Sequence, residues 1–262
     1  MRPPLRERGV PLRTLLPNTV TALALCSGLT AIRFGMLGNW EAAVLMVLAA
    51  AVLDGIDGRI ARLVHGESRF GAELDSLSDA ISFGVAPAMI LYLWALQPLG
   101  RFGWLVALLL ALFCALRLAR FNANIDRAEQ PHKSAGFLTG VPAPAGAVLA
   151  LAPLFLWLWT GHEVLRTPIA IALWTAFVAV LMISSVATFA PSIRLRHEVR
   201  FQAVAVLMGL VAALVSAPWP TLAVLAGLYL VSIPFSIRRY RRVRQLRAAG
   251  PAPSDAPAPP AP

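Results

Sequence analysis

Residues 54–79 read DGIDGRIARLVHGESRFGAELDSLSD and carry six of the 13 acidic residues in a chain of 262. This segment overlaps the ends of two apolar stretches, at about residues 40–62 and 76–97. Carboxylates at the end of a membrane-spanning helix are costly to desolvate, so they point to a function. The segment therefore predicts both a membrane fold and the position of an active site within it.

The composition indicates that the bilayer is the natural solvent of this chain. Hydrophobic residues make up 58% of it and charged residues only 14%, whereas soluble domains carry about 25% charged residues. A soluble protein of this length could not bury so much apolar surface in one core. The net charge is +10, but the arginines fall in short connecting segments, as in membrane proteins with a basic inner face. We therefore expect membrane lipids, and no nucleic acid, around this chain.

Eight apolar segments have the length of a membrane-spanning helix. They lie at about residues 15–34, 40–62, 76–97, 103–121, 140–160, 168–188, 201–217 and 219–237. With the N-terminus in the cytoplasm and the spans alternating, all but three of the 23 basic residues are cytoplasmic, the exceptions being Arg33, Arg101 and Arg166. The positive-inside rule thus predicts an all-α polytopic membrane helix bundle with about eight transmembrane helices and both termini cytoplasmic.

Tryptophan positions agree with this topology. Several fall near the predicted outer ends of spans, namely Trp40, Trp94, Trp104, Trp159 and Trp219. Indole rings prefer the depth of the membrane interface. We therefore expect these side chains to lie at the outer boundary of the bilayer.

Helical spacing gathers the aspartates on two faces. The first face carries residues at i, i+3, i+4 and i+7, which are Asp54, Asp57, Gly58 and Ala61. After a short loop, the second carries residues at i, i+4 and i+8, which are Gly71, Asp75 and Asp79. Residues at these spacings share one side of a helix. Two antiparallel helices can therefore point four carboxylates into one cavity at the cytoplasmic boundary.

Four carboxylates in a low-dielectric cavity repel one another, and either protonation or bound cations relieve that repulsion. Ligands that are all oxygen suit Mg²⁺, Mn²⁺ or Ca²⁺ rather than zinc. A two-metal carboxylate site can clamp a phosphoryl group, and glycines let a nucleotide approach the backbone closely. Arg62, one turn beyond Gly58, either pairs with phosphate oxygens or is one more inner-face arginine.

The segment resembles the signature of the CDP-alcohol phosphotransferase family. The matching pattern is Asp57-Gly58-x-x-Ala61-Arg62, eight residues, then Gly71-x-x-x-Asp75-x-x-x-Asp79, with Asp54 three residues before it. The resemblance implies that two divalent metal ions, Mg²⁺ or Mn²⁺, are held by Asp54, Asp57, Asp75 and Asp79, and that Asp79 is the catalytic base. It implies that the cytidine diphosphate portion is held by Gly58, Ala61, Arg62 and Gly71. An acceptor hydroxyl would attack the lipid-side phosphorus of a CDP-linked lipid, and CMP would leave.

Other segments are similar to those of the bacterial phosphatidylserine synthases within this family. They are residues 16–18 with Thr21 and Gly28, residues 115–122, residues 136–137 and residues 140–146. This resemblance implies CDP-diacylglycerol as donor and L-serine as acceptor. Alternative acceptors are glycerol phosphate, an inositol compound or choline, and a cation transporter is the alternative outside this class. Residues expected to bind the acceptor or a lipid phosphate are Arg117, Arg120, Asn122 and Asn18.

The chain divides into four expected parts. They are a basic cytoplasmic segment (1–14), a six-helix family core (15–188), two additional transmembrane helices (189–237) and a basic, then Pro/Ala-rich disordered tail (238–262). We expect the basic run 238–247 to be a helix lying on the inner leaflet. The resemblance further implies a homodimer in a bacterial inner membrane, with the active site facing the cytoplasm.

Overall fold

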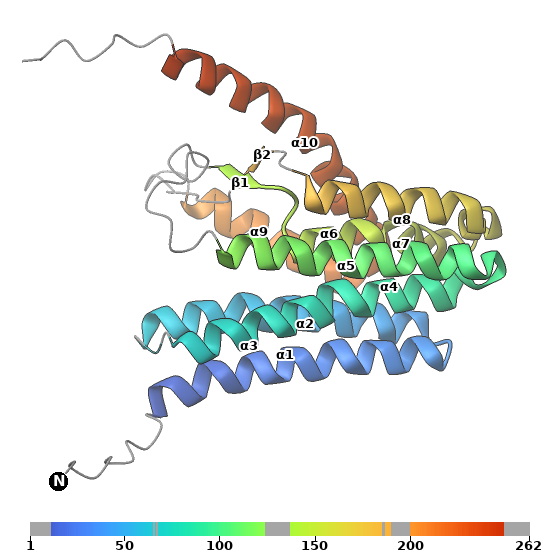
Figure 1. Ribbon diagram of the computed structural model, residues 1–262, viewed down its shortest axis with the longest axis horizontal. Helices are drawn as coiled ribbons and strands as arrows, with labels where there is room; N and C mark the ends of the chain where they lie inside the picture. The colour runs from blue at the N-terminus through green and yellow to red at the C-terminus, as the bar shows by residue number, and fades with distance from the viewer. Residues whose placement is uncertain are drawn as a thin grey trace, which may run out of the picture.

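The computed structural model describes residues 12–64, 66, 68–123, 137–184, 187–189 and 200–248. Most of the predicted basic N-terminal segment and the Pro/Ala-rich part of the tail lie outside these ranges. Within them the chain is a helix bundle with one short β-pairing (Figure 1). The prediction of a mainly helical protein is therefore confirmed.

Each predicted apolar segment forms a helix or a run of consecutive helices. The first half of the chain contains α1 (Leu12–Met36), α2 (Trp40–Leu63), α3 (Arg69–Asp79), α4 (Ala86–Leu91) and α5 (Arg101–Ala123). The second half contains α6 (Ala143–Ala150), α7 (Ala152–Thr160), α8 (Pro168–Ile183), α9 (Arg200–Ser216) and α10 (Pro218–Ala248). Two π-helical turns, Ala80–Val85 and Tyr92–Leu96, join α3 and α4 to a short 3₁₀ turn, Gln97–Leu99.

Among the described helices, four are long and apolar enough to cross a membrane. They are Leu15–Met36, Arg69–Leu99, Arg101–Ala123 and Pro218–Ile237. The pair α6 and α7, bent by 40°, would make a fifth, while α8 and the apolar part of α9 are shorter. In α2 the apolar run is interrupted by Asp54, Asp57 and Arg59. The chain is thus an integral membrane protein, and the expected total of eight spans stays a prediction.

Helix boundaries follow from local chemistry. The Asn39 side chain accepts a hydrogen bond from the Ala42 backbone N–H at 3.1 Å and so caps α2. Gly38 and Gly100 adopt positive φ, as the turns predicted at residues 38–39 and 98–100 require. The turn predicted at residues 218–220 is wrong by a few residues, because α9 already ends at Ser216 and α10 begins at Pro218. Proline suits the first position of a helix, where its missing N–H needs no partner.

Two predicted spans differ from single straight helices. Residues 140–160 break at Leu151 because Pro153 cannot donate an N–H to the preceding turn. The segment predicted to run to residue 188 ends as a helix at Ile183. Beyond it, β2 (Ala187–Phe189) pairs antiparallel with β1 (Phe137–Thr139). The expectation of a purely α-helical chain is therefore wrong in this small region.

Two other expectations need correction. Trp94 is only 1% exposed and packs edge-on against Trp157, with ring centroids 5.8 Å apart, so it is a core residue rather than an interfacial one. The basic run 238–247 is the last part of the single helix α10 and not a separate helix. Figure 1 shows this end of α10 projecting away from the bundle.

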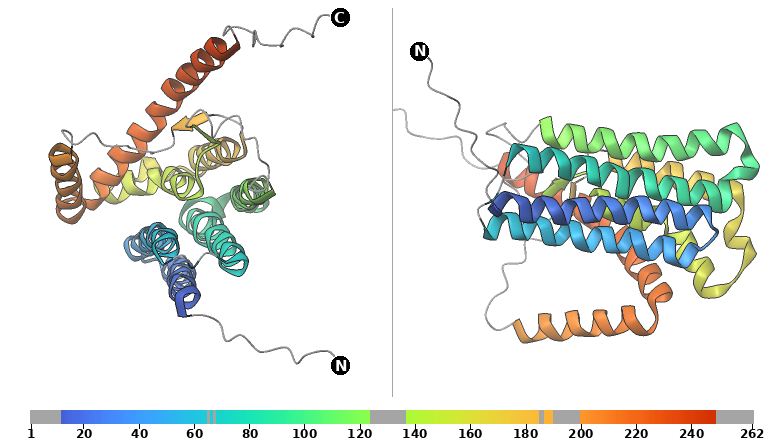
Figure 2. Two further views of the ribbon diagram at one scale, coloured as in Figure 1. Left: turned by 90° about the vertical axis from the view of Figure 1, so that its left-hand side faces the viewer. Right: turned by 90° about the horizontal axis from the view of Figure 1, so that it is seen from below.

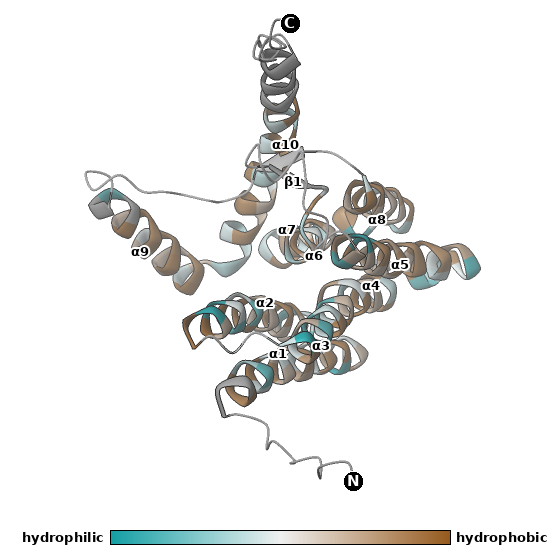
Figure 3. Ribbon diagram, turned by 60° about the vertical axis from the view of Figure 1, so that its left-hand side comes forward, coloured by the Kyte–Doolittle hydropathy of each residue, from teal (hydrophilic) through white to brown (hydrophobic). Residues whose placement is uncertain are grey.

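The helices are arranged so that α1 and α2 form an antiparallel pair beside the column of α3 and α4 (Figure 2). Beyond that column lie α5 and α8, and α10 packs on α6 and α7. In Figure 2, α9 stands apart from the bundle and joins it through α10. Hydrophilic parts of α2 and α3 lie close to α1, whereas the outer helices are mainly hydrophobic (Figure 3). The aspartates thus lie on the parts of α2 and α3 that flank their shared turn.

Close packing of α1 against the helical column gives a prediction about stability. A Cβ added to Gly28 would lie 2.8 Å from the Ser82 Cα, a backbone atom that cannot move aside. Gly28→Ala should therefore lower the melting temperature in detergent, because overpacking costs about 1–3 kcal/mol. The matched control is Gly209→Ala in α9, where a Cβ would meet nothing within 4 Å. A melting temperature for Gly28→Ala equal to that of the control would contradict the packing described.

Candidate active site

The aspartates predicted from spacing come together between α2 and α3. One carboxylate oxygen from each of Asp54, Asp57 and Asp75 lies within 4.8 Å of the others. The Asp79 carboxyl interacts electrostatically with Asp54 and Asp75. Three of the four predicted carboxylates thus meet between the two helices, and a role for Asp79 in the same group stays a prediction.

This group has the chemistry of a site for a hard divalent cation. Its ligand atoms are all carboxylate oxygens, which suit Mg²⁺, Mn²⁺ or Ca²⁺. Asp57 is 4% exposed, and the other members are half-buried. Charges so close together in a partly dehydrated site need compensating positive charge. The residues present thus fit a metal centre.

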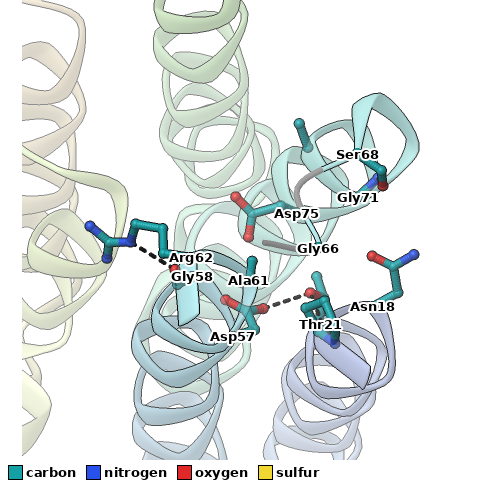
Figure 4. Close-up of a pocket in the computed structure, with 12 residues that line it drawn as sticks. Asn18, Thr21, Asp57, Gly58, Ala61, Arg62, Gly66, Ser68, Gly71 and Asp75 are labelled. Atoms are coloured by element: carbon teal, nitrogen blue, oxygen red, sulfur yellow. Dashed lines mark hydrogen bonds between the residues drawn. The ribbon is translucent and has the colours of Figure 1, made fainter. Parts of the chain in front are cut away.

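A hydroxyl on α1 holds one of these carboxylates. Thr21 is buried and its Oγ1 donates a hydrogen bond to Asp57 Oδ2 at 2.6 Å (Figure 4). The Thr21 backbone carbonyl accepts a hydrogen bond from Ser78 Oγ of α3 at 3.3 Å. Spacing along α2 and α3 gave no sign of this partner, since it lies on a third helix. Thr21 is one of several polar residues in the first segment, so its presence there did not single it out.

A cavity of about 360 Å³ opens beside the cluster between α1, α2 and α3 (Figure 4). It is within the range of small-molecule sites in proteins. Residues predicted from the sequence that line it are Asn18, Asp57, Gly58, Ala61, Arg62, Gly71 and Asp75. The residues expected to hold a nucleotide diphosphate therefore share one cavity with two of the aspartates. Asn18, expected to bind the acceptor or a lipid phosphate, lines the same cavity.

The two glycines of the cavity differ in their surroundings. A Cβ on Gly58 would meet nothing within 4 Å, so this position is open toward the cavity. A Cβ on Gly71 would lie 2.8 Å from Asn18 Oδ1, so Gly71 allows α1 and α3 to approach closely. Ser68 caps α3 by accepting a hydrogen bond from the Gly71 N–H at 3.0 Å. Helix packing therefore explains why position 71 is a glycine, but it does not require a glycine at position 58.

Arg62 has a partner within its own helix. Its Nε donates to the Gly58 carbonyl at 2.9 Å, and its side chain points away from the Thr21–Asp57 pair in Figure 4. The side chain is exposed. It therefore stands at the rim of the cavity, where terminal guanidinium nitrogens can meet a phosphate.

The remaining predicted residues lie on α5 and do not line this cavity. Arg120 donates to the Ser184 carbonyl at the end of α8 at 3.2 Å. Asn122 Nδ2 donates to Ser76 Oγ of α3 at 2.7 Å. Arg117 is half-buried and interacts electrostatically with Asp79. Its Nε has no hydrogen-bond partner among the residues that the structure describes. Arg120 and Asn122 thus bond to other helices of the protein, whereas the Arg117 Nε–H is available to donate to a ligand.

Comparisons with known proteins agree with these features. A family model described as CDP-alcohol phosphatidyltransferase matches residues 14–187, and one described as CDP-alcohol phosphatidyltransferase 2 matches residues 201–234. A CDP-diacylglycerol–serine O-phosphatidyltransferase of Mycobacterium tuberculosis is 39% identical, over 92% of this chain and 84% of that protein. The Bacillus subtilis enzyme of the same name is 32% identical, over 65% of this chain and 88% of that protein. An archaetidylserine synthase of Methanothermobacter thermautotrophicus is 35% identical, over 65% of this chain and 68% of that protein.

The open position at Gly58 gives a prediction that separates ligand binding from folding. Gly58→Ala removes room in the cavity without a clash inside the protein, and alanine favours a helix by about 1 kcal/mol. The variant should fold at least as stably as wild type but bind CDP more weakly, by tenfold or more. The matched control is Gly55→Ala, on the same helix and equally open, which does not line the cavity. Equal CDP affinity for both variants, measured by calorimetry, would show that the nucleotide does not approach Gly58.

Proposed function

Because the chain belongs to the CDP-alcohol phosphatidyltransferase family, we propose that it transfers the phosphatidyl group from CDP-diacylglycerol to the hydroxyl of L-serine. The products are phosphatidylserine and CMP. The observation that carries the reaction class is the group of carboxylates at the family-matched positions, with oxygens within 4.8 Å of one another. Serine as acceptor is supported by the names of the relatives, which include enzymes that resemble this chain over most of its length.

Two divalent metal ions, Mg²⁺ or Mn²⁺, are the proposed cofactors. Their proposed ligands are Asp54, Asp57, Asp75 and Asp79. When bound, such ions neutralise the diphosphate and stabilise the charge that develops on its oxygens. The all-oxygen ligand set supports this choice. The protein's own part is to hold the four carboxylates in one partly buried group.

Asp79 is the proposed general base. It is half-buried beside Asp54, at the end of α3 and next to the π-helical turn Ala80–Val85. Its carboxylate accepts the proton of the serine hydroxyl as that oxygen bonds to the lipid-side phosphorus. The bond from this phosphorus to the CMP oxygen breaks, and CMP leaves with the electron pair. The proton on Asp79 then passes to solvent or to the departing CMP.

The nucleotide portion of the donor is proposed to occupy the cavity of about 360 Å³. Gly58 and Ala61 give it a wall without bulky side chains, and Gly71 keeps α1 and α3 close. Arg62 at the rim is proposed to pair with a phosphate oxygen. The diacyl tails of the donor would remain in the surrounding lipid, which the apolar outer helices contact.

Arg117 is the proposed partner of the serine carboxylate. It combines electrostatic contact with Asp79 and an Nε that lacks a hydrogen-bond partner in the described part of the chain. A guanidinium and a carboxylate form a strong charge-assisted pair. An amino-acid acceptor bound in this way would bring its hydroxyl toward the proposed base. Arg120 and Asn122 then support the site by joining α5 to α8 and α3.

Membrane arrangement follows the same proposal. The α2–α3 turn and the β1–β2 pair lie at one end of the bundle (Figure 1), and the aspartates lie on the parts of α2 and α3 that flank this turn. We propose that this end faces the cytoplasm of a bacterial inner membrane, in an eight-span topology with both termini cytoplasmic. The family match over residues 14–187 supports a core at 15–188 followed by two additional helices. A homodimer remains a prediction from the family resemblance.

Purified protein tests the reaction directly. With CDP-diacylglycerol and Mg²⁺ or Mn²⁺, labelled serine should give a lipid product and stoichiometric CMP. Asp79→Asn should reduce turnover at least a thousandfold with an unchanged melting temperature, because the base is lost. Glu73→Gln, an exposed acid on the same helix, is the matched control and should retain activity. Product from glycerol phosphate, inositol or choline but not from serine would contradict the acceptor assignment.

The role of Arg117 predicts a selective kinetic defect. Arg117→Gln should raise the KM for serine at least tenfold, because the carboxylate loses a charged partner worth about 1.5–3 kcal/mol. The KM for CDP-diacylglycerol should change much less. Arg101→Gln, at the other end of α5, is the control and should leave both constants unchanged. Equal increases in the two KM values would instead indicate a role in binding the donor phosphate.

A further inference from the structure

Thr21 contacts both helices of the aspartate cluster through different atoms. Its Oγ1 donates to Asp57 Oδ2 of α2 at 2.6 Å, and its backbone carbonyl accepts from Ser78 Oγ of α3 at 3.3 Å. Thr21, Asp57 and Ser78 are each at most 4% exposed. These contacts are therefore shielded from water. The first holds the Asp57 side chain, and the second holds α3 at Ser78.

The hydroxyl of Thr21 has a single proton and two acceptors within reach. The Pro17 carbonyl lies at 3.1 Å, whereas Asp57 Oδ2 lies at 2.6 Å, a length typical of an O–H group bound to a carboxylate. An acceptor that is charged outcompetes a neutral carbonyl for that proton. Thr21 thus fixes one oxygen of Asp57 and with it the orientation of the carboxylate.

The same face of α1 continues this contact one helical turn further along. Ser82 Oγ donates to the Ala24 carbonyl at 3.3 Å, and Gly28 lies against Ser82 without room for a side chain. The helix that carries Asp75 and Asp79 is therefore held against α1 at several points. Thr21 stands at the end of this contact that is nearest to the carboxylates.

We propose that Thr21 is a positioning residue of the metal site, which orients the Asp57 carboxylate and ties α1 to both α2 and α3. The inference rests on the proposed function in one respect, namely that the carboxylates bind divalent metal. Partners behind a metal ligand fix its orientation, and their loss commonly lowers metal affinity by about 10–100-fold. Thr21 itself need not touch metal or substrate.

Binding of Mn²⁺ to the purified full-length protein, without substrates, tests the proposal. Free Mn²⁺ is measured by electron paramagnetic resonance, and the rise in melting temperature with Mn²⁺ gives a second readout. Thr21→Val, which keeps the shape and removes the donor, should weaken binding about 10–100-fold. Thr21→Ser restores the donor and should bind within about threefold of wild type. Thr19→Val is the control, because the exposed Thr19 hydroxyl donates to the Leu15 carbonyl of its own helix.

A second comparison covers the case in which Thr21→Val does not fold. In an Asp57→Asn background the carboxylate that Thr21 orients is absent, so adding Thr21→Val should change Mn²⁺ affinity by less than about threefold. A larger loss there would overturn the proposal, as would wild-type affinity for Thr21→Val alone. Failure of the wild-type protein itself to bind Mn²⁺ would overturn the metal centre of the proposed function, and the inference with it. Weak Mn²⁺ binding by Thr21→Val, together with near-wild-type binding by Thr21→Ser and Thr19→Val, would support the proposal.

Discussion

Repulsion among the carboxylates of α2 and α3 is the constraint on which the rest of the structure depends. Two unit charges 4 Å apart interact by about 4 kcal/mol at an effective dielectric constant of about 20. For Asp54, Asp57 and Asp75, whose oxygens lie within 4.8 Å of one another, three such pairs amount to roughly 10 kcal/mol. That is comparable with the whole unfolding free energy of a typical domain. The ionised cluster therefore needs compensating positive charge, which the proposed divalent cations would supply.

The helices around the cluster meet this constraint in two ways. Small residues and serine hydroxyls on the shared surface of α1 and the α3–α4 column allow close and fixed packing, as at Gly28 and Ser82. The open side at Gly58 leaves a cavity rather than a packed core. A closely packed wall thus holds the carboxylates together, while the adjoining cavity leaves room for a ligand. Placing this arrangement at one end of the bundle keeps the apolar outer surface of the other helices in contact with lipid.

Much of this arrangement could be predicted from the sequence. Apolar runs located the helices, and spacings of three and four residues gathered the aspartates on facing sides of α2 and α3, because both patterns are local. The family resemblance, drawn from residues 54–79, is confirmed by the match over residues 14–187. The roles of individual site residues stay predictions.

Features that depend on contacts between distant segments were missed. The β1–β2 pair joins segments about fifty residues apart, and its strands are only three residues long. Trp94 matched an interfacial pattern, but its neighbour Trp157 comes from another helix. Thr21 contacts Asp57 only because of the register between α1 and α2. None of these relations has a local signature in the chain.

The central claim is that the four aspartates form a two-metal centre, and the location of bound Mn²⁺ tests it most directly. Anomalous diffraction from crystals of the protein grown with Mn²⁺ and CDP would locate the ions. The account predicts two peaks about 3.5–4 Å apart, both between α2 and α3 and each within about 2.5 Å of oxygens from Asp54, Asp57, Asp75 or Asp79. Fully occupied ions elsewhere, with none between these helices, would contradict it.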